Sequence, residues 1–312
     1  MKNIILKVSL LLVLSTSLFG CNLGDGTGFK TPLATTSHKL NIQNGTAVTD
    51  PSLNGMIPLV YIASSKSICT GTLLSQDIVL TAAHCVMNMR PKELNEPYSE
   101  KEVVAPQNVF LILSKNLNRP VNGARFESWN IYQVEKIYAH KDAYKGAEVW
   151  LNESNINLLK IYDIDQINDV AILKLNRPVD SQYKFAKLAM ENPRIKTKVV
   201  IAGYGYNDIP PLNGTVEVLN AAISEVYEVY PSGSSIKVGG TIESQIGYTK
   251  TCQGDSGGPD LIYNAVTNQY IITGIHSFGY GAFCGYSSVP STSMSVAYYL
   301  EWIESGYLIN HL

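Results

Sequence analysis

The stretch Cys252-Gln253-Gly254-Asp255-Ser256-Gly257-Gly258-Pro259 carries the strongest signal in this 312-residue chain. It sets one serine hydroxyl among three glycines, directly after an aspartate. A glycine-rich stretch can be an ordinary loop, but its serine can also act as a nucleophile. A serine hydroxyl is weakly nucleophilic at neutral pH and attacks a carbonyl only where a base takes its proton. A catalytic role for Ser256 therefore requires a base elsewhere in the chain.

Two further segments offer the partners that such a serine needs. Thr81-Ala82-Ala83-His84-Cys85 directly follows an apolar run, and Asp169 opens the apolar run that continues to Leu175. Histidine has a pKa near neutrality, so it can accept the serine proton and return it. A buried carboxylate holds the imidazole in one tautomer and stabilises its charged form. We predict that Ser256 is the nucleophile, His84 the base and acid, and Asp169 the orienting carboxylate.

In the order His, Asp, Ser, these three segments resemble the trypsin/chymotrypsin-like serine proteases from about residue 42 to the C-terminus. The resemblance implies peptide-bond hydrolysis through an acyl-enzyme, without a metal or cofactor. It implies an all-β fold of two antiparallel six-stranded β-barrels with a C-terminal α-helix. It also implies that the backbone N–H groups of Gly254 and Ser256 form the oxyanion hole, where a side chain at position 254 would crowd the site.

The resemblance also interprets the cysteines and one serine. The chain has five cysteines, and lipidation of Cys21 would leave four, for which the count alone allows three pairings. The family pattern implies disulfides between Cys69 and Cys85 and between Cys252 and Cys284. Ser277-Phe278-Gly279 resembles the family's Ser-Trp-Gly segment. It would support Asp169 through Ser277 and pair with the substrate backbone through Gly279 as an added strand.

The residue six positions before the nucleophile usually lies at the base of the family's primary specificity pocket. Trypsin-like members carry an aspartate there, but here it is Lys250. Thr251 follows it, and His276 precedes Ser277, a combination that resembles the glutamyl endopeptidases. A buried positive charge would repel a basic substrate side chain, so we predict cleavage after Glu. Alternatively, Lys250 points to solvent or to Glu243, His276 only lines the wall, and the primary specificity differs.

Activation by cleavage is a further expectation from the resemblance. Ile42-Gln43-Asn44-Gly45 resembles the family's Ile-Val-Gly-Gly, so Ile42 is the candidate new N-terminus. Its ammonium would pair with Asp255, whose buried carboxylate needs a partner. The preceding residue is Asn41, where an activating trypsin would require Lys or Arg. The activating enzyme is therefore not indicated by the sequence.

The N-terminus predicts export. Residues 1–20 combine a short basic region with an apolar run too short to span a bilayer, so they read as a lipoprotein signal peptide. Leu18-Phe19-Gly20-Cys21 resembles a bacterial lipobox, which implies a lipid on Cys21. An ordinary secretory signal cut nearby is the alternative. Residues 21–41 are interpreted as a tether and propeptide. The enzyme would be anchored at the cell envelope through this lipid alone, or released by cutting at Ile42.

Composition limits the remaining possibilities. Hydrophobic residues make up 45% of the chain and charged residues 16%, which excludes a disordered protein. The formal net charge of −2 leaves no basic excess for nucleic-acid binding. We expect a monomer that acts on a protein or peptide substrate. The rival interpretations are a protease fold kept as a binding module without turnover, and an esterase with the same triad.

Short apolar runs between turn residues predict strands. They are Ile57–Ile62, Ile78–Leu80, Val109–Leu113, Val170–Leu175, Val199–Ala202 and Tyr270–Ile275. Val296, Leu300 and Ile303 predict one C-terminal helix that ends at Gly306. The polar region 86–165 is expected to form long surface loops. We expect an N-terminal barrel over 42–185, which includes this insertion, and a C-terminal barrel with the helix over 186–312.

Overall fold

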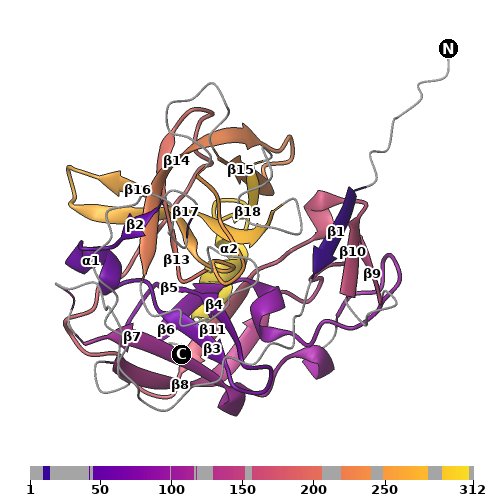
Figure 1. The fold of residues 1–312 in the computed structure, drawn as a ribbon, viewed down its shortest axis with the longest axis horizontal. Coiled ribbons are helices and arrows are strands. Elements are labelled where there is room, and N and C mark those ends of the chain that lie inside the picture. The colour runs from indigo at the N-terminus through magenta and orange to yellow at the C-terminus, as the bar shows by residue number, and fades with distance from the viewer. Residues whose placement is uncertain are drawn as a thin grey trace, which may run out of the picture.

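The computed structural model describes residues 10–14, 42, 45–98, 100–115, 117, 129–151, 157–205, 219–239, 249–279 and 290–308. Two large antiparallel sheets form the body of the protein, and each curls around an apolar interior (Figure 1). A small three-stranded sheet lies to one side of them, at the right of Figure 1. The helices are short and few in the described part of the chain.

The first large sheet contains seven strands in the order β4-β3-β7-β8-β11-β6-β5. Its terminal strands follow each other in the chain through Gly71, so the sheet is almost closed into a barrel. Alternate residues of its strands point into the barrel, and most of the apolar interior comes from them. The strands are β3 (Leu59–Ile62), β4 (Ser67–Thr70), β5 (Thr72–Leu73), β6 (Ile78–Thr81), β7 (Val109–Ser114), β8 (Trp129–Ala139) and β11 (Ala171–Leu175).

The second large sheet is a closed barrel of six antiparallel strands, because β17 pairs with both β16 and β18. Its strands are β13 (Lys198–Gly203), β14 (Asn220–Val229), β15 (Ser235–Val238), β16 (Pro259–Asn264), β17 (Gln269–Phe278) and β18 (Ser291–Ser295). Two short strands flank it: β12 (Lys187–Leu188) pairs with β17, and β2 (Thr46–Ala47) pairs with β14. The predicted fold of two antiparallel β-barrels is therefore confirmed, with one additional strand in the first barrel.

The six predicted strands are all present, but the expectation for residues 86–165 was wrong. This region contains β8, the hairpin of β9 (Ala147–Leu151) and β10 (Asn157–Ile161), and the short helices η2 (Glu100–Glu102), η3 (Pro106–Asn108) and η5 (Ile164–Gln166). Strand β8 alternates buried and exposed side chains, with Tyr132 and Val134 inside. Such alternation interrupts the apolar run by which strands were recognised.

A short part of the predicted export signal is described. Leu10–Leu14 form β1, which pairs antiparallel with β10. An apolar extended segment can add to the open edge of a hairpin, because edge N–H and C=O groups lack partners. No helix in the described ranges is long and apolar enough to cross a membrane.

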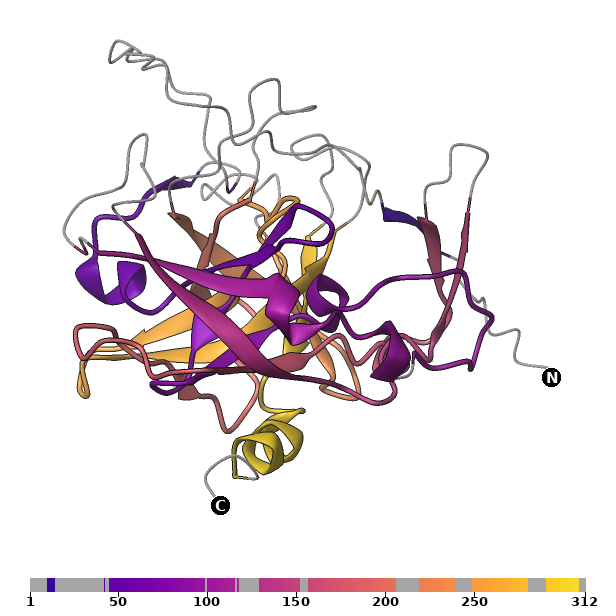
Figure 2. The ribbon, with the colours of Figure 1, turned by 90° about the horizontal axis from the view of Figure 1, so that it is seen from below.

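The predicted C-terminal helix is α2 (Leu300–Leu308), which lies outside the barrels at the bottom of Figure 2. It does not end at Gly306, because the helix continues through this residue. A methyl group on Gly306 would lie 2.8 Å from Ile172 Cδ1, so glycine allows the helix to approach β11. The other helices are α1 (Pro51–Asn54) and the 3-10 turn η1 (Ala83–Val86).

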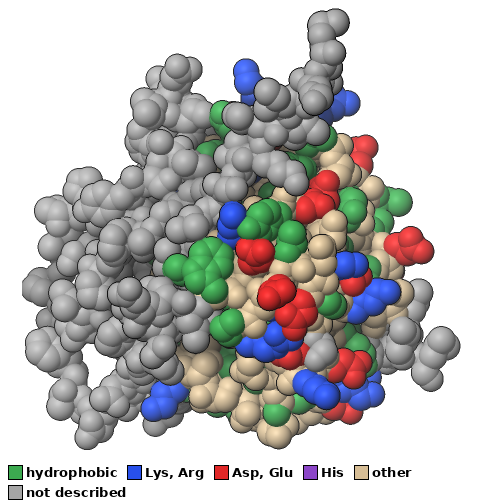
Figure 3. All heavy atoms as spheres, turned by 90° about the vertical axis from the view of Figure 1, so that its right-hand side faces the viewer, with side chains coloured by type: hydrophobic (Ala, Val, Ile, Leu, Met, Phe, Trp, Pro, Cys, Tyr) green, Lys and Arg blue, Asp and Glu red, His purple; other side chains and the backbone are tan. Residues whose placement is uncertain are grey.

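The face on the right of Figure 1 is shown in Figure 3, where Lys and Arg side chains alternate with Asp and Glu over its described part. No large patch of one sign is visible among the described residues of this face, as the near-neutral sequence predicts. Charged side chains also pair directly, since the Arg90 guanidinium lies 2.7 Å from Glu96 and 2.8 Å from Glu102.

Candidate active site

The pairing of β6 with β11 brings His84 to Asp169. Ala171 lies opposite Thr81 in this ladder, so the residues just after β6 and just before β11 meet at one end of the barrel. The His84 Nδ1 lies 2.7 Å from Asp169 Oδ2, and the backbone N–H of His84 donates to Oδ1 at 2.8 Å. Asp169 is fully buried, whereas His84 keeps part of its ring exposed. The carboxylate therefore fixes both the backbone and the ring of the histidine.

The surroundings of His84 and Asp169 favour the charged forms of both side chains. Burial opposes a charge on Asp169, but attraction to His84 and the hydrogen bonds from His84 and Ser277 outweigh it and lower its pKa. Burial likewise opposes a charge on His84, and the Asp169 carboxylate outweighs that effect and raises its pKa. The Ser277 hydroxyl donates to Asp169 Oδ2. An imidazolium at position 84 is thus stabilised inside the site.

Two residues that sequence reasoning missed support the pair. The hydroxyl of buried Tyr144 lies 3.4 Å from His84 Nδ1, and burial with the nearby Asp169 charge raises the pKa of Tyr144 well above its usual value. Asn168 has a positive φ of 48°, and its side chain accepts from Tyr299 at 3.2 Å and donates to the Asp142 carbonyl at 3.1 Å. No local motif marks either residue, because their partners are distant in sequence.

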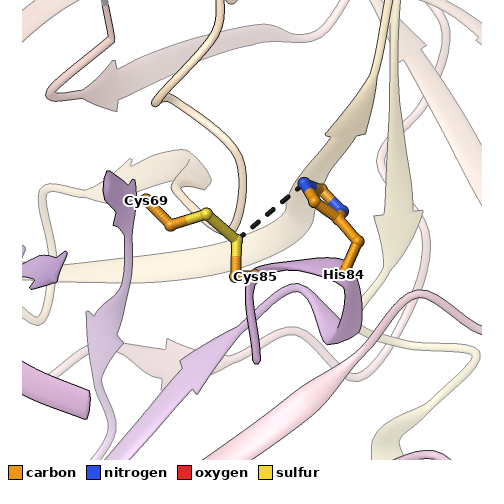
Figure 4. A group of neighbouring side chains, drawn as sticks. All are labelled: Cys69, His84 and Cys85. Atoms are coloured by element: carbon orange, nitrogen blue, oxygen red, sulfur yellow. Dashed lines mark hydrogen bonds between the residues drawn. A yellow bond between two sulfur atoms is a disulfide. The ribbon is translucent and has the colours of Figure 1, made fainter. Parts of the chain in front are cut away.

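Ser256 lies beside this pair, across the Cys69–Cys85 disulfide. The Cys85 sulfur is 3.9 Å from His84 Nε2 and 3.6 Å from the Ser256 carbonyl oxygen. Figure 4 shows the imidazole next to this disulfide. The Ser256 hydroxyl makes no hydrogen bond to any described residue. The three residues of the predicted triad therefore lie close together between the barrels. The Ser256 hydroxyl is not hydrogen-bonded to His84.

The loop that contains Ser256 has two backbone N–H groups that can donate to a ligand. Gly254 has a φ of 95° and Gly257 a φ of 80°, values that favour glycine. A Cβ at Gly254 would lie only 3.0 Å from the Gly205 Cα. Among the described residues, neither the N–H of Gly254 nor that of Ser256 has a hydrogen-bond partner. Two such amides beside a serine can receive a developing oxyanion.

Asp255 is buried, and its two carboxyl oxygens accept the backbone N–H groups of Gly205 and Cys252, each at 2.7 Å. Burial raises the pKa of Asp255 to about 7. Ile42 is also buried, in the apolar cluster of the second barrel that contains Val199 and Val226. Asn41 lies outside the described residues. The carboxyl group is thus held by two amides, and the attraction of His276 only partly offsets its burial.

The residues predicted for the specificity pocket are all described. Lys250 is only 7% exposed and its ammonium is buried without a hydrogen-bond partner, which lowers its pKa to about 8. This burial excludes the alternative in which Lys250 points to solvent, whereas Glu243 lies outside the described residues. The Thr251 N–H donates to Ser291 at 3.3 Å. Gly279 is exposed after β17. Lys250 is therefore a buried cation without a counter-charge among the described residues.

His276 is fully enclosed. Its Nδ1 lies 3.2 Å from the Asp255 carbonyl and its Nε2 3.0 Å from Asp260 Oδ1. Burial opposes a charge on this ring, but the Asp260 and Asp255 groups outweigh it and raise the pKa of His276. Both ring nitrogens therefore have partners inside the protein, so any effect of His276 on a substrate is exerted through its charge.

The Cys69–Cys85 disulfide is confirmed, with a Cα–Cα distance of 6.1 Å. Cys252, in the loop before Asp255, is also disulfide-bonded. Cys284 and Cys21 lie outside the described residues, so Cys284 as the partner of Cys252 and the lipidation of Cys21 stay predictions. Among the described residues, the one cluster with metal-ligating atoms consists of this disulfide and His84. Its sulfurs are bonded to each other, so they do not offer thiolates to a metal.

Two β-barrels with a buried His–Asp pair and a glycine-framed serine between them define a chymotrypsin-like serine endopeptidase. The family model described as Trypsin matches residues 42–119 and 130–303, and the chain belongs to this family. Known relatives are similar over most of both chains. The platelet-aggregating proteinase PA-BJ of Bothrops jararaca is 28% identical, over 78% of this chain and 85% of its own. The venom plasminogen activator Haly-PA of Gloydius brevicauda is also 28% identical (79% and 80%), and snake venom serine proteinase 11 of Crotalus adamanteus is 27% identical (81% and 83%).

Proposed function

We propose that Ser256, His84 and Asp169 are the catalytic triad of this serine endopeptidase, and that Gly254 and Ser256 supply its oxyanion hole. The observation that carries the proposal is the buried contact between His84 Nδ1 and Asp169, with Ser256 beside the same imidazole. The Ser256 hydroxyl has no competing partner among the described residues, so it is available to rotate toward His84 Nε2 when a substrate binds.

The reaction follows from these positions. Ser256 Oγ attacks the scissile carbonyl carbon while His84 Nε2 takes its proton, and the carbonyl oxygen becomes an oxyanion held by the two N–H groups. Asp169 stabilises the imidazolium. Collapse of the tetrahedral intermediate breaks the C–N bond, and Nε2 returns the proton to the departing amine. Water then repeats the sequence on the acyl-enzyme, with His84 as base, and releases the acid.

Covalent labelling tests this assignment. A fluorophosphonate probe should label the activated enzyme on Ser256, and Ser256→Ala should abolish both labelling and peptide hydrolysis. His84→Ala should slow labelling by several orders of magnitude, because the serine then lacks its base. A Ser256→Ala enzyme that still hydrolyses peptides would overturn the triad. A correctly folded wild-type enzyme, cut at Ile42, that neither reacts nor hydrolyses would instead favour a binding module.

We further propose a preference for an acidic residue before the cleaved bond, with Glu favoured. The support is the Lys250 ammonium, which is buried and lacks a partner among the described residues. A substrate carboxylate would neutralise it, whereas an arginine would bring a second positive charge into the same space.

Three peptides that differ only in Glu, Arg or Phe at the cleaved position test the preference. The Glu peptide should have the highest kcat/KM, and Lys250→Met should remove most of that advantage at similar side-chain length. Lys237→Met is the matched control, because Lys237 on β15 already has a carboxylate partner in Glu228 on β14. Faster cleavage of the Arg peptide by the wild-type enzyme would contradict the proposal and indicate another primary specificity.

We propose that the enzyme is made with an export signal over residues 1–20, a tether over 21–41 and a catalytic part in two halves, 42–185 and 186–312. The relatives whose names identify them as venom proteins support export. Cutting before Ile42 would supply an ammonium for the buried Asp255 carboxyl, whose pKa is raised to about 7 and which accepts hydrogen bonds from backbone amides alone among the described residues. N-terminal sequencing of active enzyme should begin at Ile42, and mass spectrometry of the uncut form should find a lipid on Cys21. An active enzyme that keeps residues before Ile42 would contradict activation by cleavage.

A further inference from the structure

Thr70 joins the two barrels at the loop that carries the nucleophile. It is the last residue of β4 in the first barrel and is fully buried. Its hydroxyl donates to the Gly254 carbonyl at 2.8 Å and accepts the N–H of Tyr204 at 3.0 Å. Its own N–H donates to the Ser256 carbonyl at 2.8 Å. One residue of the first barrel therefore holds two carbonyls of the loop that belongs to the second.

These contacts fix the direction of the two free amides. Gly254 can adopt many backbone conformations, so its positive φ needs an external restraint to persist. The Thr70 hydroxyl supplies that restraint on the carbonyl side, while the Ser256 carbonyl is held by the Thr70 N–H. The Gly254 carbonyl shares its peptide with the N–H of Asp255, and the Ser256 carbonyl shares its peptide with the N–H of Gly257. The Ser256 N–H therefore lies between two anchored peptides and the Gly254 N–H directly precedes the first of them, which limits the directions that both N–H groups can take.

The same hydroxyl is linked to the Asp255 carboxyl. Tyr204 and Gly205 are consecutive, and their N–H groups donate to the Thr70 hydroxyl and to Asp255 Oδ1, respectively. The Thr70 carbonyl in turn accepts the Thr81 hydroxyl at 2.9 Å, three residues before His84. Thr70 is thus bonded to the segment that holds Asp255, to the oxyanion loop and to the strand that leads to the histidine.

We infer that the Thr70 side chain is a positioning residue that holds the oxyanion loop in its active conformation. The inference rests on the proposed function, because it concerns the same two N–H groups. Without the hydroxyl, Gly254 is free to rotate, and the oxyanion hole is complete in only a fraction of the molecules. The loss falls on the step in which the oxyanion forms, whereas binding of the intact substrate depends on other contacts.

The test replaces Thr70 with valine, which keeps the branched shape and removes the hydroxyl. Thr70→Val should lower kcat by about 10–100-fold with KM changed less than about threefold, a smaller loss than deleting an oxyanion donor itself. Binding of a peptide aldehyde, which forms an oxyanion on Ser256, should weaken by the same factor as kcat. Binding of a substrate-like peptide that cannot react should not change. Thr70→Ser should restore most of the activity.

Thr72→Val is the matched control. Thr72 is two residues away and equally buried, but its hydroxyl has no hydrogen-bond partner, so valine there should leave kcat within about twofold. If Thr70→Val does not accumulate as folded protein, Thr70→Ala takes its place with the same expectation. Two outcomes would overturn the inference. One is a Thr70→Ser enzyme that is as impaired as Thr70→Val, and the other is a Thr70→Val enzyme with unchanged kcat and unchanged affinity for the aldehyde. Ser256→Ala assayed alongside separates this outcome from failure of the proposed triad.

Discussion

Burial disfavours the positive charge of Lys250, so the effect of this residue on substrates should depend on pH. Its ammonium is buried and unpartnered, and its pKa is lowered to about 8. The charge is therefore present below about pH 8 and is lost above it. We predict that kcat/KM for a Glu peptide, divided by that for the matching Gln peptide, falls as pH rises through about 8. Dividing by the Gln peptide removes every titration that the two substrates share, including that of His84.

The pH profiles of both peptides, measured between pH 6.5 and 9.5, check this prediction. Lys250→Met should give a low ratio that does not change with pH. A wild-type ratio that stays constant from pH 7 to 9.5 would show that Lys250 does not contact the substrate side chain.

Tyr144 should influence the acidic limb of the pH profile of kcat/KM. Its hydroxyl lies 3.4 Å from His84 Nδ1 and interacts with the Asp169 carboxylate. A donor at Asp169 partly neutralises this carboxylate, so removing it strengthens the attraction for a charged His84. We predict that Tyr144→Phe raises the pKa of His84 and moves the acidic limb of kcat/KM to higher pH. The matched control is Tyr98→Phe, since Tyr98 touches Tyr144 by its ring edge and its hydroxyl donates to the Arg90 carbonyl. Equal shifts in both variants would indicate a change in packing.

The sequence could point to some of these residues but not to others. His84, Asp169 and Ser256 stand in segments whose residue order carries information, so they were candidates before any contact was known. Tyr144 and Thr70 stand in no such segment. The Thr70 hydroxyl bonds to a carbonyl 184 positions away, and only the packing of one barrel against the other creates that contact.

At the scale of elements, the conformation of the loop that carries Ser256 depends on Gly257, because a side chain at this position would collide with neighbouring atoms. Gly257 has a φ of 80°, and a Cβ there would lie 2.1 Å from Thr81 Oγ1 and 2.4 Å from the Thr70 carbonyl. A backbone atom cannot yield as a side chain does, so the loop would have to move. We predict that Gly257→Ala lowers the free energy of unfolding by about 3 kcal/mol or more and abolishes activity.

Gly233→Ala is the control for this effect, measured by urea unfolding in parallel. Gly233 has a nearly equal φ of 83°, but its Cβ would meet only the Asn192 side chain, at 3.0 Å. Strain without a backbone collision should cost about 1 kcal/mol. Losses of equal size in the two variants would contradict the collision as the cause.

Helix α2 is held by the first barrel. It has nine residues, too few to be stable alone, so its packing must stabilise it. Ile303 is fully buried, Tyr299 bonds to Asn168 beside the catalytic acid, and the rings of Tyr299 and Trp302 contact His140. We predict that Ile303→Ala lowers the free energy of unfolding by about 2–4 kcal/mol, whereas Glu304→Ala at the exposed neighbour changes it by less than about 0.5. Calorimetry of both variants checks this, and a stable Ile303→Ala protein would show that α2 is not part of the cooperative fold.

The elements that the sequence predicted are those whose apolar runs are continuous. Strand β6 is buried throughout and β11 at every position except Lys174, so both appear as nearly continuous apolar runs. Strands β8 and β14 have one exposed face, and their polar residues interrupt the apolar signal although both are ten residues or longer. Gly306 was expected to end α2 because glycine usually follows a helix, but here close contact with Ile172 requires it inside the helix.

At the scale of the whole molecule, the two barrels meet through polar contacts as well as through the active site. The Ser234 hydroxyl in the second barrel donates to Asp165 of the first at 2.6 Å, and Thr70 binds the nucleophile loop. The number of barrels follows from the family resemblance and is confirmed by the sheets. The contacts between them could not be predicted, since they depend on single polar side chains in loops without a repeating pattern.

Ionisation of Asp255 should make the free energy of unfolding of the uncut chain depend on pH. Its carboxyl is buried, and its pKa is raised to about 7 from an ordinary value near 4. A group that binds its proton more tightly when folded stabilises the fold below its unfolded pKa, and that stability is lost as pH rises to the folded pKa. This single group should therefore lower the free energy of unfolding by about 4 kcal/mol between about pH 4 and pH 7.

Cutting before Ile42 should remove this loss, because the new ammonium would pair with the carboxylate and lower its pKa. We predict that the cut form is more stable than the uncut form by an amount that grows between pH 5 and pH 7.5. Ser256→Ala protein with an unrelated protease site before Ile42 allows both forms to be compared by calorimetry without self-digestion. Asp255→Asn should abolish the pH dependence of this difference, since the asparagine cannot ionise. A difference that is the same at pH 5 and pH 7.5 in the parent protein would mean that the Ile42 ammonium does not reach Asp255, and activation would then require another cation at this carboxyl.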